Sequence, residues 1–151
     1  MRNSLRVYLG LGSNLGEKEE NIHRAVSLLE ERLGSPCSAL SSLMETAPWG
    51  FESSNYFVNA CARFDLDVPE SEEQALRLLD ICKGIEKDMG REEIAAGEGY
   101  KDRIIDIDIL LFGDLKMDTR TLTIPHPLMF RREFVMLPLR EIMENELYLQ
   151  R

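Results

Sequence analysis

Four segments of the chain have the hydrophobic pattern of β-strands. In the first, Val7, Leu9 and Leu11 alternate with residues of the opposite face. The fourth is almost wholly aliphatic, as is typical of a strand packed on both sides. The predicted strands cover about residues 5–12, 38–46, 56–66 and 104–112.

Three further segments are predicted to be helical. The first begins near residue 17 and ends at Gly34-Ser35-Pro36. The second begins at Ser71, which has the spacing of a capping box with Gln74, and stops at Gly90. The third covers about 131–142. The apolar stripes of the first two helices are Ile22, Ala25, Val26, Leu29 and Leu33, and Ala75, Leu78, Leu79, Cys82, Ile85 and Met89.

The order of these elements predicts the fold class. Strands and helices follow one another as β-α-β-β-α-β, which is the order of a ferredoxin-like α/β sandwich with a mainly antiparallel sheet. A short ribbon at 115–117 and 121–124 and the third helix complete the chain. Residues 91–102 have no clear period and two glycines, which favours a mobile surface loop. We expect a single domain over residues 1–151 that leaves one sheet face free of the first two helices.

Composition and charge exclude several classes of protein. No apolar run is long enough to span a membrane, and the N-terminus lacks the apolar block of a signal peptide. The three cysteines are widely spaced, which favours a reduced, cytoplasmic protein. The net charge is −9, from 27 acidic and 18 basic residues, and this is the wrong sign for a general nucleic-acid binder.

Asp106 and Asp108 stand out within the aliphatic fourth strand. Side chains two apart in a strand share a face, so both carboxylates point one way and the neighbouring isoleucines point the other way. An ordinary solvated strand face is one interpretation of this pattern. The other is that the two like charges bracket one or two hard cations, and magnesium shared with a polyphosphate fits this spacing best.

Basic residues flank the acidic strand in the sequence. If the fold gathers these residues around a metal-binding carboxylate pair, they supply the positive charge that binding of a triphosphate requires. The chain has no P-loop motif, and its glycines do not match the dinucleotide-binding fingerprint. The flanking residues are Arg91, Lys101, Arg103, His126, Arg131 and Arg132.

The third predicted strand carries a polar residue among apolar ones. Asn59 lies two residues after Phe57 and therefore on the same face. A buried asparagine is usually a structural residue. Its amide also suits the edge of a planar heterocycle stacked on an aromatic ring.

Seven motifs in order resemble the 6-hydroxymethyl-7,8-dihydropterin pyrophosphokinase family of folate biosynthesis. The resemblance covers the chain from about Val7 to Ile142. The motifs are GLGSNLG (10–16), ETAPWG (45–50), FVNA (57–60), IEKDMGR (85–91), DRIIDIDILLFGD (102–114), LTIPHP (122–127) and R-x-FV-x-x-PL-x-EI (132–142).

The resemblance implies a reaction, its ligands and its site residues. The diphosphate of ATP passes to the pterin hydroxymethyl group and AMP is released, with two Mg²⁺ ions held by Asp106 and Asp108. The segments 47–55 and 91–102 are expected to close over the substrates. By position, the catalytic residues are Arg91, Arg103, Asp106 and Asp108, and the ATP-binding residues are Glu86, Arg91, Arg103, Thr123, His126 and Arg132. The pterin-binding residues are Thr46, Pro48, Trp49, Phe57, Asn59 and Phe134.

The chain departs from the family pattern at a few positions. Glu92 and Glu93 follow Arg91, where the family often has more basic residues. Lys101-Asp102 stands where many members have Gly-Pro, Tyr100 where many have Trp, and Thr121 where some have Arg.

Two other classes of protein compete with this interpretation. A nucleic-acid-binding ferredoxin-like module is set aside, because the charge is wrong and acids occupy the strand face that RNA would need. A non-catalytic relative that binds only pterin or nucleotide stays open, although the retained acidic and basic residues argue against it. We expect ATP and the pterin as partners, no nucleic acid or membrane, and a monomer.

Overall fold

The computed structural model describes residues 4–46, 56–90 and 103–149. Its main sheet has the order β2-β4-β1-β5, with β3 also paired to β4, and every pairing is antiparallel. The strands are β1 (Leu5–Ser13), β2 (Cys37–Leu40), β3 (Met44–Thr46), β4 (Phe57–Leu66) and β5 (Asp106–Phe112). A separate ribbon pairs β6 (Met117–Asp118) with β7 (Thr123–Ile124). The predicted mixed sandwich with an antiparallel sheet is confirmed.

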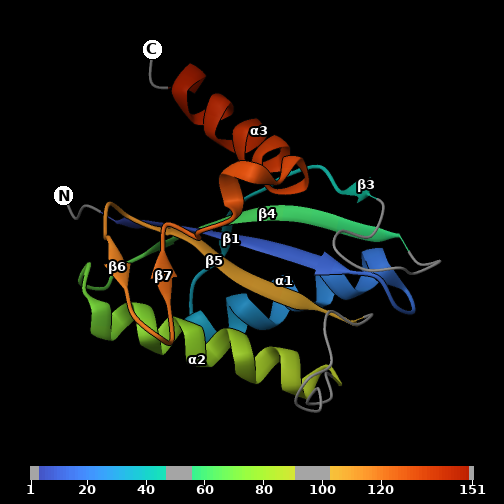
Figure 1. The fold of residues 1–151 in the computed structure, drawn as a ribbon, viewed down its shortest axis with the longest axis horizontal. Coiled ribbons are helices and arrows are strands. Elements are labelled where there is room, and N and C mark those ends of the chain that lie inside the picture. The colour runs from blue at the N-terminus through green and yellow to red at the C-terminus, as the bar shows by residue number, and fades with distance from the viewer. Residues whose placement is uncertain (1–3, 47–55, 91–102, 150–151) are drawn as a thin grey trace.

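Helices cover both faces of the sheet, but not equally (Figure 1). The helices α1 (Lys18–Leu33) and α2 (Glu72–Asp88) lie side by side on one face. The 3-10 turn η1 (Met129–Arg131) and the helix α3 (Glu133–Leu149) lie on the other face, where α3 packs on β4 and β3. The face opposite α1 and α2 is therefore free of those two helices, as expected, and α3 covers one part of it.

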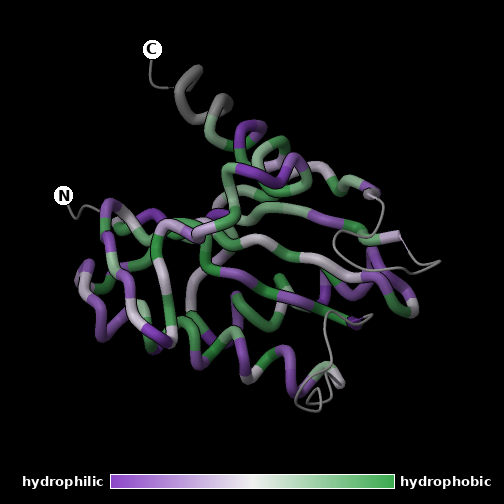
Figure 2. The backbone as a smooth tube through the Cα atoms, in the orientation of Figure 1, coloured by the Kyte–Doolittle hydropathy of each residue, from purple (hydrophilic) through white to green (hydrophobic). Residues whose placement is uncertain are grey.

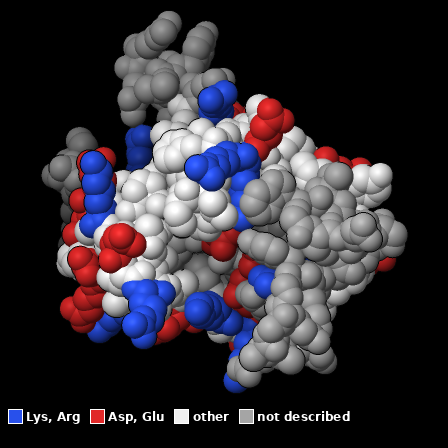
Figure 3. Space-filling model, in the orientation of Figure 1, with Lys and Arg blue, Asp and Glu red and all other residues white. Residues whose placement is uncertain are grey.

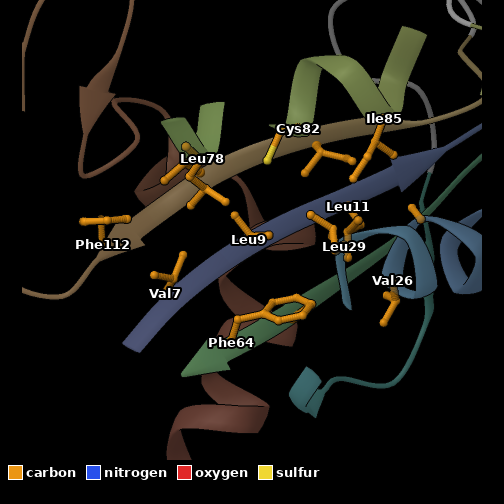
Figure 4. Close-up of a cluster of buried hydrophobic side chains, with 14 of the residues drawn as sticks. Val7, Leu9, Leu11, Val26, Leu29, Phe64, Leu78, Cys82, Ile85 and Phe112 are labelled. Carbon is orange, nitrogen blue, oxygen red and sulfur yellow. The ribbon is translucent and has the colours of Figure 1, made fainter. Parts of the chain in front are cut away.

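The main core fills the space between the sheet and the helices α1 and α2 (Figure 4). Both predicted helix stripes point into it, and only Leu33 and Leu79 are partly rather than fully buried. The hydropathy view shows the same division, with hydrophobic positions recurring along the helices toward the sheet (Figure 2). Non-directional burial of apolar surface is the main force that holds these layers together.

Local signals set the ends of the helices. Ser71 Oγ accepts the backbone N–H of Gln74 at 3.2 Å, as the predicted capping box requires, and α2 begins at the next residue. Gly34 ends α1 in the left-handed conformation, with φ of 66°, and its N–H donates to the Glu30 carbonyl. None of the three cysteines, all in the described part of the chain, forms a disulfide.

The predicted strand at 38–46 is wrong as a single element. It is split into β2 and β3, because Ser41, Ser42 and Leu43 leave the regular ladder. Ser41 Oγ accepts the N–H of Cys61 at 2.8 Å in place of a backbone carbonyl. The N–H of Ser42 turns to a side chain of α3, which lies 99 positions later in the sequence.

The third helix and the ribbon also differ from their predicted bounds. The predicted helix at 131–142 begins as the turn η1 and continues in α3 as far as Leu149. Pro138 lies buried inside α3. The strands of the ribbon are only two residues each and begin later than predicted.

A bulge explains why β5 is aliphatic on both sides. Its register against β1 shifts between Tyr8 and Leu9, and Leu110 is the extra residue. Before the bulge, Ile107 and Ile109 point to the main core. After it, Leu110 and Leu111 both pack in the second hydrophobic cluster beneath α3. Phe112 returns to the main core, so the strand is packed on both faces, as predicted.

Candidate active site

The two strand aspartates lie opposite glycines of the neighbouring strand. Asp106 pairs with Gly12 and Asp108 pairs with Gly10 across β1 and β5. Gly12 also pairs with Asn59 on the far side of β1. Directly paired residues share a sheet face, so Asp106, Gly12 and Asn59 form one row across three strands. Because Gly12 has no side chain, the sheet surface between the Asp106 carboxylate and the Asn59 amide is shallow.

The Asp106 carboxylate has a cation beside it. Arg103 Nη1 lies 3.1 Å from Asp106 Oδ1 in a partly buried ion pair. In the view of Figure 3, acidic and basic side chains lie next to one another around a hollow near the middle of the molecule. A charge-assisted pair of this kind fixes the orientation of both groups.

Asp108 lies in a more negative environment. Burial raises the pKa of Asp108 to about 7, and the negative charges of Asp106 and Glu86 act in the same direction. The guanidinium groups of Arg132 and Arg103 oppose this rise. The Asp108 carboxyl therefore favours a proton or a bound cation, mainly because it is buried and also because two other acidic groups lie near it.

Glu86 enters the site from helix α2. Its side chain is buried, and its Oε2 accepts the N–H of Ile107 at 2.8 Å on the outer edge of β5. The same hydrogen bond fixes the strand segment between the two aspartates.

His126 and Arg132 approach the acidic pair from the segment after β7. The N–H of His126 donates to the Leu110 carbonyl at 3.1 Å, which attaches this segment to β5. His126 Nδ1 accepts the N–H of Leu128 at 3.3 Å, so its proton is assigned to Nε2. Burial and the Arg132 charge lower the pKa of His126, while Asp106 acts in the opposite direction. The imidazole is therefore neutral at physiological pH and can donate one hydrogen bond from Nε2.

The Asn59 amide and the Phe57 ring form the other end of the row, and Phe134 lies beside Arg132. Asn59 Nδ2 donates to Thr46 Oγ1 at 2.8 Å, and Asn59 is almost fully buried. A methyl group on Gly12 would lie 3.0 Å from Asn59 Oδ1 and 3.7 Å from Cδ1 of Phe57. Phe134 lies in the first turn of α3, with the Arg132 guanidinium 5.5 Å from its ring centre. The predicted proximity of Phe57 and Asn59 on one face is confirmed.

Some predicted residues lie apart from these groups or outside the described residues. Thr123 is in the ribbon, where its Oγ1 donates to Asp118 Oδ1 at 3.1 Å. Arg91, Pro48 and Trp49 lie outside the described residues, as do the two segments predicted to close over the substrates. The neighbouring departures from the family pattern, Glu92, Glu93 and residues 100–102, lie there too.

Asn14 is a site-supporting residue that the sequence interpretation missed. It is fully buried and forms two hydrogen bonds with the backbone of Arg103. Its Oδ1 accepts the Arg103 N–H at 2.6 Å, and its own N–H donates to the Arg103 carbonyl at 3.0 Å. Its place in the turn GSNLG was the available signal, but a turn asparagine usually serves only its own turn.

Comparison with known sequences identifies the family. The sequence profile of the 7,8-dihydro-6-hydroxymethylpterin-pyrophosphokinase family matches residues 8–144. The chain belongs to this family. It is 41% identical to the 2-amino-4-hydroxy-6-hydroxymethyldihydropteridine pyrophosphokinase of Porphyromonas gingivalis, over 90% of this chain and 89% of the relative. The corresponding enzyme of Aquifex aeolicus is 37% identical, over 94% of this chain and 82% of the relative.

Some pyrophosphokinase relatives are parts of longer proteins. The chain is 37% identical to a mitochondrial bifunctional folate synthesis protein of Pisum sativum and spans 25% of its length. A solved structure of HPPK-DHPS in complex with substrates matches 93% of this chain and 40% of its own, with a TM-score of 0.68 and 17% identity. That likeness supports the fold. The predicted pyrophosphokinase family, and with it the class of transferase, is confirmed. No described helix is both long and apolar enough to cross a membrane.

Proposed function

We propose that this chain, acting as one domain, transfers the diphosphate of ATP to the hydroxymethyl group of 6-hydroxymethyl-7,8-dihydropterin and releases AMP. The observation that carries the proposal is the row Asp106–Gly12–Asn59 in a member of the pyrophosphokinase family. The acidic end of the row suits a metal-bound polyphosphate. The amide end suits a heterocycle. ATP, which donates the diphosphate, and the pterin, which accepts it, would therefore meet above Gly12.

The phosphate half of the site is assigned to charged side chains around β5. Arg103 and Arg132 both act on the charge of Asp108, so both lie within electrostatic reach of a polyphosphate bound there. His126 donates a hydrogen bond from Nε2 to a phosphate oxygen. Arg91, Glu86 and Thr123 are assigned to the nucleotide by the family resemblance.

The residues present fit magnesium. Two carboxylates share one face, and burial together with the nearby Asp106 and Glu86 charges raises the pKa of Asp108, so a bound cation would stabilise its ionised form. In the described part of the chain, no group of three or more His, Cys, Asp or Glu side chains is arranged to hold a metal ion. Magnesium commonly takes one or two carboxylates and completes its shell with water and phosphate oxygens. Asp106 and Asp108 would hold two such ions, which when bound neutralise phosphate charge during transfer.

The acceptor half of the site is assigned to β3, β4 and the start of α3. Phe57 and Phe134 stack on the pterin ring, and Asn59, fixed by Thr46, hydrogen-bonds its edge. Pro48 and Trp49 are assigned to the same ligand by the resemblance.

The chemistry is an in-line displacement at phosphorus. The pterin hydroxyl oxygen forms a bond to the β-phosphorus, the bond from that phosphorus to the α,β-bridging oxygen breaks, and AMP leaves. Positioning of the two substrates and neutralisation of charge supply most of the acceleration in reactions of this type. We assign no general base to the hydroxyl proton.

Product identity tests the proposal. Purified protein is incubated with Mg-ATP, with and without the pterin, and AMP is separated from ADP by chromatography. The expected result is pterin-dependent AMP that is lost in Asp106→Ala and Asp108→Ala variants with normal circular dichroism. Formation of ADP, or binding of both ligands without turnover, would overturn the proposal, and the second result would indicate a non-catalytic relative.

A further inference from the structure

A carboxylate of α3 holds the break between β2 and β3. Glu141 accepts the N–H of Ser42 at 3.1 Å on Oε1 and 3.0 Å on Oε2, and the Ser42 hydroxyl donates to Oε1 at 2.6 Å. Hydrogen bonds to an ionised acceptor are roughly twice as strong as neutral ones. Glu141 belongs to the motif R-x-FV-x-x-PL-x-EI, and the proposed function gives it no role.

The contact joins the two sides of the acceptor half of the site. On one side, Ser42 leads directly into β3, whose last residue is Thr46, the partner of Asn59. On the other side, α3 carries Phe134 in its first turn. Because Ser42 and Leu43 lie outside the strand ladder, the Glu141 carboxylate is the side-chain link that ties this connection to the helix.

Pro138 weakens the backbone connection between Phe134 and the rest of α3. A proline inside a helix has no N–H to donate to the carbonyl four residues earlier, and here that carbonyl belongs to Phe134. The turn that carries Phe134 is therefore less firmly joined to the rest of α3. It is supported by Arg132, at 5.5 Å from the ring centre, and by the neighbouring Val135 and Met136, which pack against the second hydrophobic cluster.

Helix α3 is anchored on the sheet on both sides of the proline, because Val135 and Met136 before it also pack against the second hydrophobic cluster. Leu139 and Ile142 pack in the second hydrophobic cluster with Tyr8 and Cys61 on the sheet. These apolar contacts hold the helix down on β4 but do not fix how far β3 lies from it. Non-directional packing sets the distance between layers, whereas directed hydrogen bonds set lateral position.

We infer that Ser42 and Glu141 are positioning residues that set the distance between α3, which carries Phe134, and β3, whose Thr46 holds Asn59. The space between these two elements is called the slot. The inference rests on the proposed function, because it assumes that a planar heterocycle occupies this slot. Neither residue touches the reacting atoms. Their effect therefore falls mainly on the acceptor, and it reaches the nucleotide only through Arg132, which lies beside Phe134.

Steady-state kinetics of Ser42→Ala and Glu141→Ala test the inference. In Glu141→Ala the expected result is a rise of about tenfold in KM for the pterin, which corresponds to about 1.4 kcal/mol, with a much smaller change in KM for ATP. Ser42→Ala keeps the backbone N–H that donates to Glu141 and should show a smaller rise. Because the two residues act as one pair, the double variant should be no worse than the poorer single variant. Glu141→Gln keeps an acceptor oxygen and should recover part of the pterin affinity, and it remains informative if Glu141→Ala folds poorly.

The ion pair between Arg32 and Asp88 provides a matched control. It is also a solvent-exposed contact between distant segments, in this case joining α1 and α2. Asp88→Ala should leave KM for the pterin unchanged. Equal loss of both substrates in the Ser42 and Glu141 variants, or a lower melting temperature with normal KM, would overturn the inference. Wild-type protein without pterin-dependent AMP would instead refute the proposed function itself.

Discussion

Asp108 occupies a position that costs stability in the absence of ligands. Its carboxyl is surrounded by protein and lies near two other acidic groups, and this raises its pKa from 3.8 to about 7. Residues arranged for function often oppose folding, because the charge that a ligand needs is unfavourable when the ligand is absent. The ligand-free protein therefore binds a proton that its unfolded chain would release.

The first prediction concerns Asp108→Asn and pH. Between about pH 4 and 7 the folded state binds more protons at this site than the unfolded state does, so the free energy of unfolding falls as pH rises through this window. The variant lacks this contribution and should melt a few degrees higher than wild type at pH 8, without ligands. Thermal denaturation of both proteins from pH 4 to 8 checks this. The same variant should form no AMP. Identical pH profiles of the melting temperature would contradict the prediction.

The second prediction concerns Asn14. Asn14→Ala leaves the N–H of Arg103 without the Oδ1 acceptor, and an unsatisfied buried donor costs about 1–3 kcal/mol. We expect lower thermal stability and a higher KM for ATP, because Arg103 is the phosphate-side residue that Asn14 holds. Asn14→Asp keeps the acceptor oxygen and should retain more ATP affinity than Asn14→Ala. Equal KM values for ATP in both variants would refute this role.

Single residues were predictable where spacing alone carried the information. Asp106 and Asp108 were found because two carboxylates in an aliphatic strand are costly to bury, and Asn59 because it interrupts an apolar strand. Asn14 was missed because its partner is the backbone of Arg103, 89 positions away, and backbone partners leave no mark in the sequence.

Strand β1 shapes the site because two of its residues that face the aspartates are glycines and have no side chain. Gly10 and Gly12 face the two aspartates in a strand whose other positions are filled, and neither has a positive φ. Alanine is thus compatible with the backbone at both positions, and the space above each glycine decides what a methyl group would do.

The third prediction compares Gly12→Ala with Gly10→Ala. At Gly12 the new methyl group would lie 3.0 Å from Asn59 Oδ1, whereas at Gly10 it would lie 3.4 Å from the nearest methyl group of Leu110. Crowding of the Asn59 amide should raise KM for the pterin by about tenfold, in line with an overpacking cost of about 1–3 kcal/mol. Gly10→Ala should change KM for the pterin much less. Kinetics of both variants check this, and equal effects would contradict it.

The elements were predictable to different degrees for physical reasons. Strong periodicity located α1, α2, β1 and β4 within a few residues. The break between β2 and β3 could not be predicted, because the acceptor of the Ser42 N–H lies on α3. The bulge at Leu110 also left no signal, since aliphatic residues suit either face of β5.

The whole molecule separates stability and function onto opposite faces of one sheet. The face under α1 and α2 carries the main core, and the other is shared between α3 and the row of site residues. The order of elements predicted the first face. It could not predict which part of the second face α3 covers, because that depends on contacts of Leu139 and Ile142 with residues far away in the sequence. Helix position on an open face is a tertiary property, not a local one.

The fourth prediction follows from the hydrogen bond between Glu86 and Ile107 and concerns solubility. β5 is the outermost strand on its side of the sheet, and its sequence is mainly aliphatic. The His126 N–H covers this edge at the Leu110 carbonyl, but a strand edge with unpaired backbone groups can pair with another chain and seed aggregation. The Glu86 carboxylate occupies the outward N–H of Ile107 and places a negative charge at the edge.

Glu86→Ala should therefore scatter more light on incubation at high concentration than Glu86→Gln, which keeps an acceptor oxygen. Equal scattering would mean that this carboxylate does not protect the edge. If the difference is found, one buried acid in the nucleotide half of the site also keeps the protein dispersed at the concentrations at which it works.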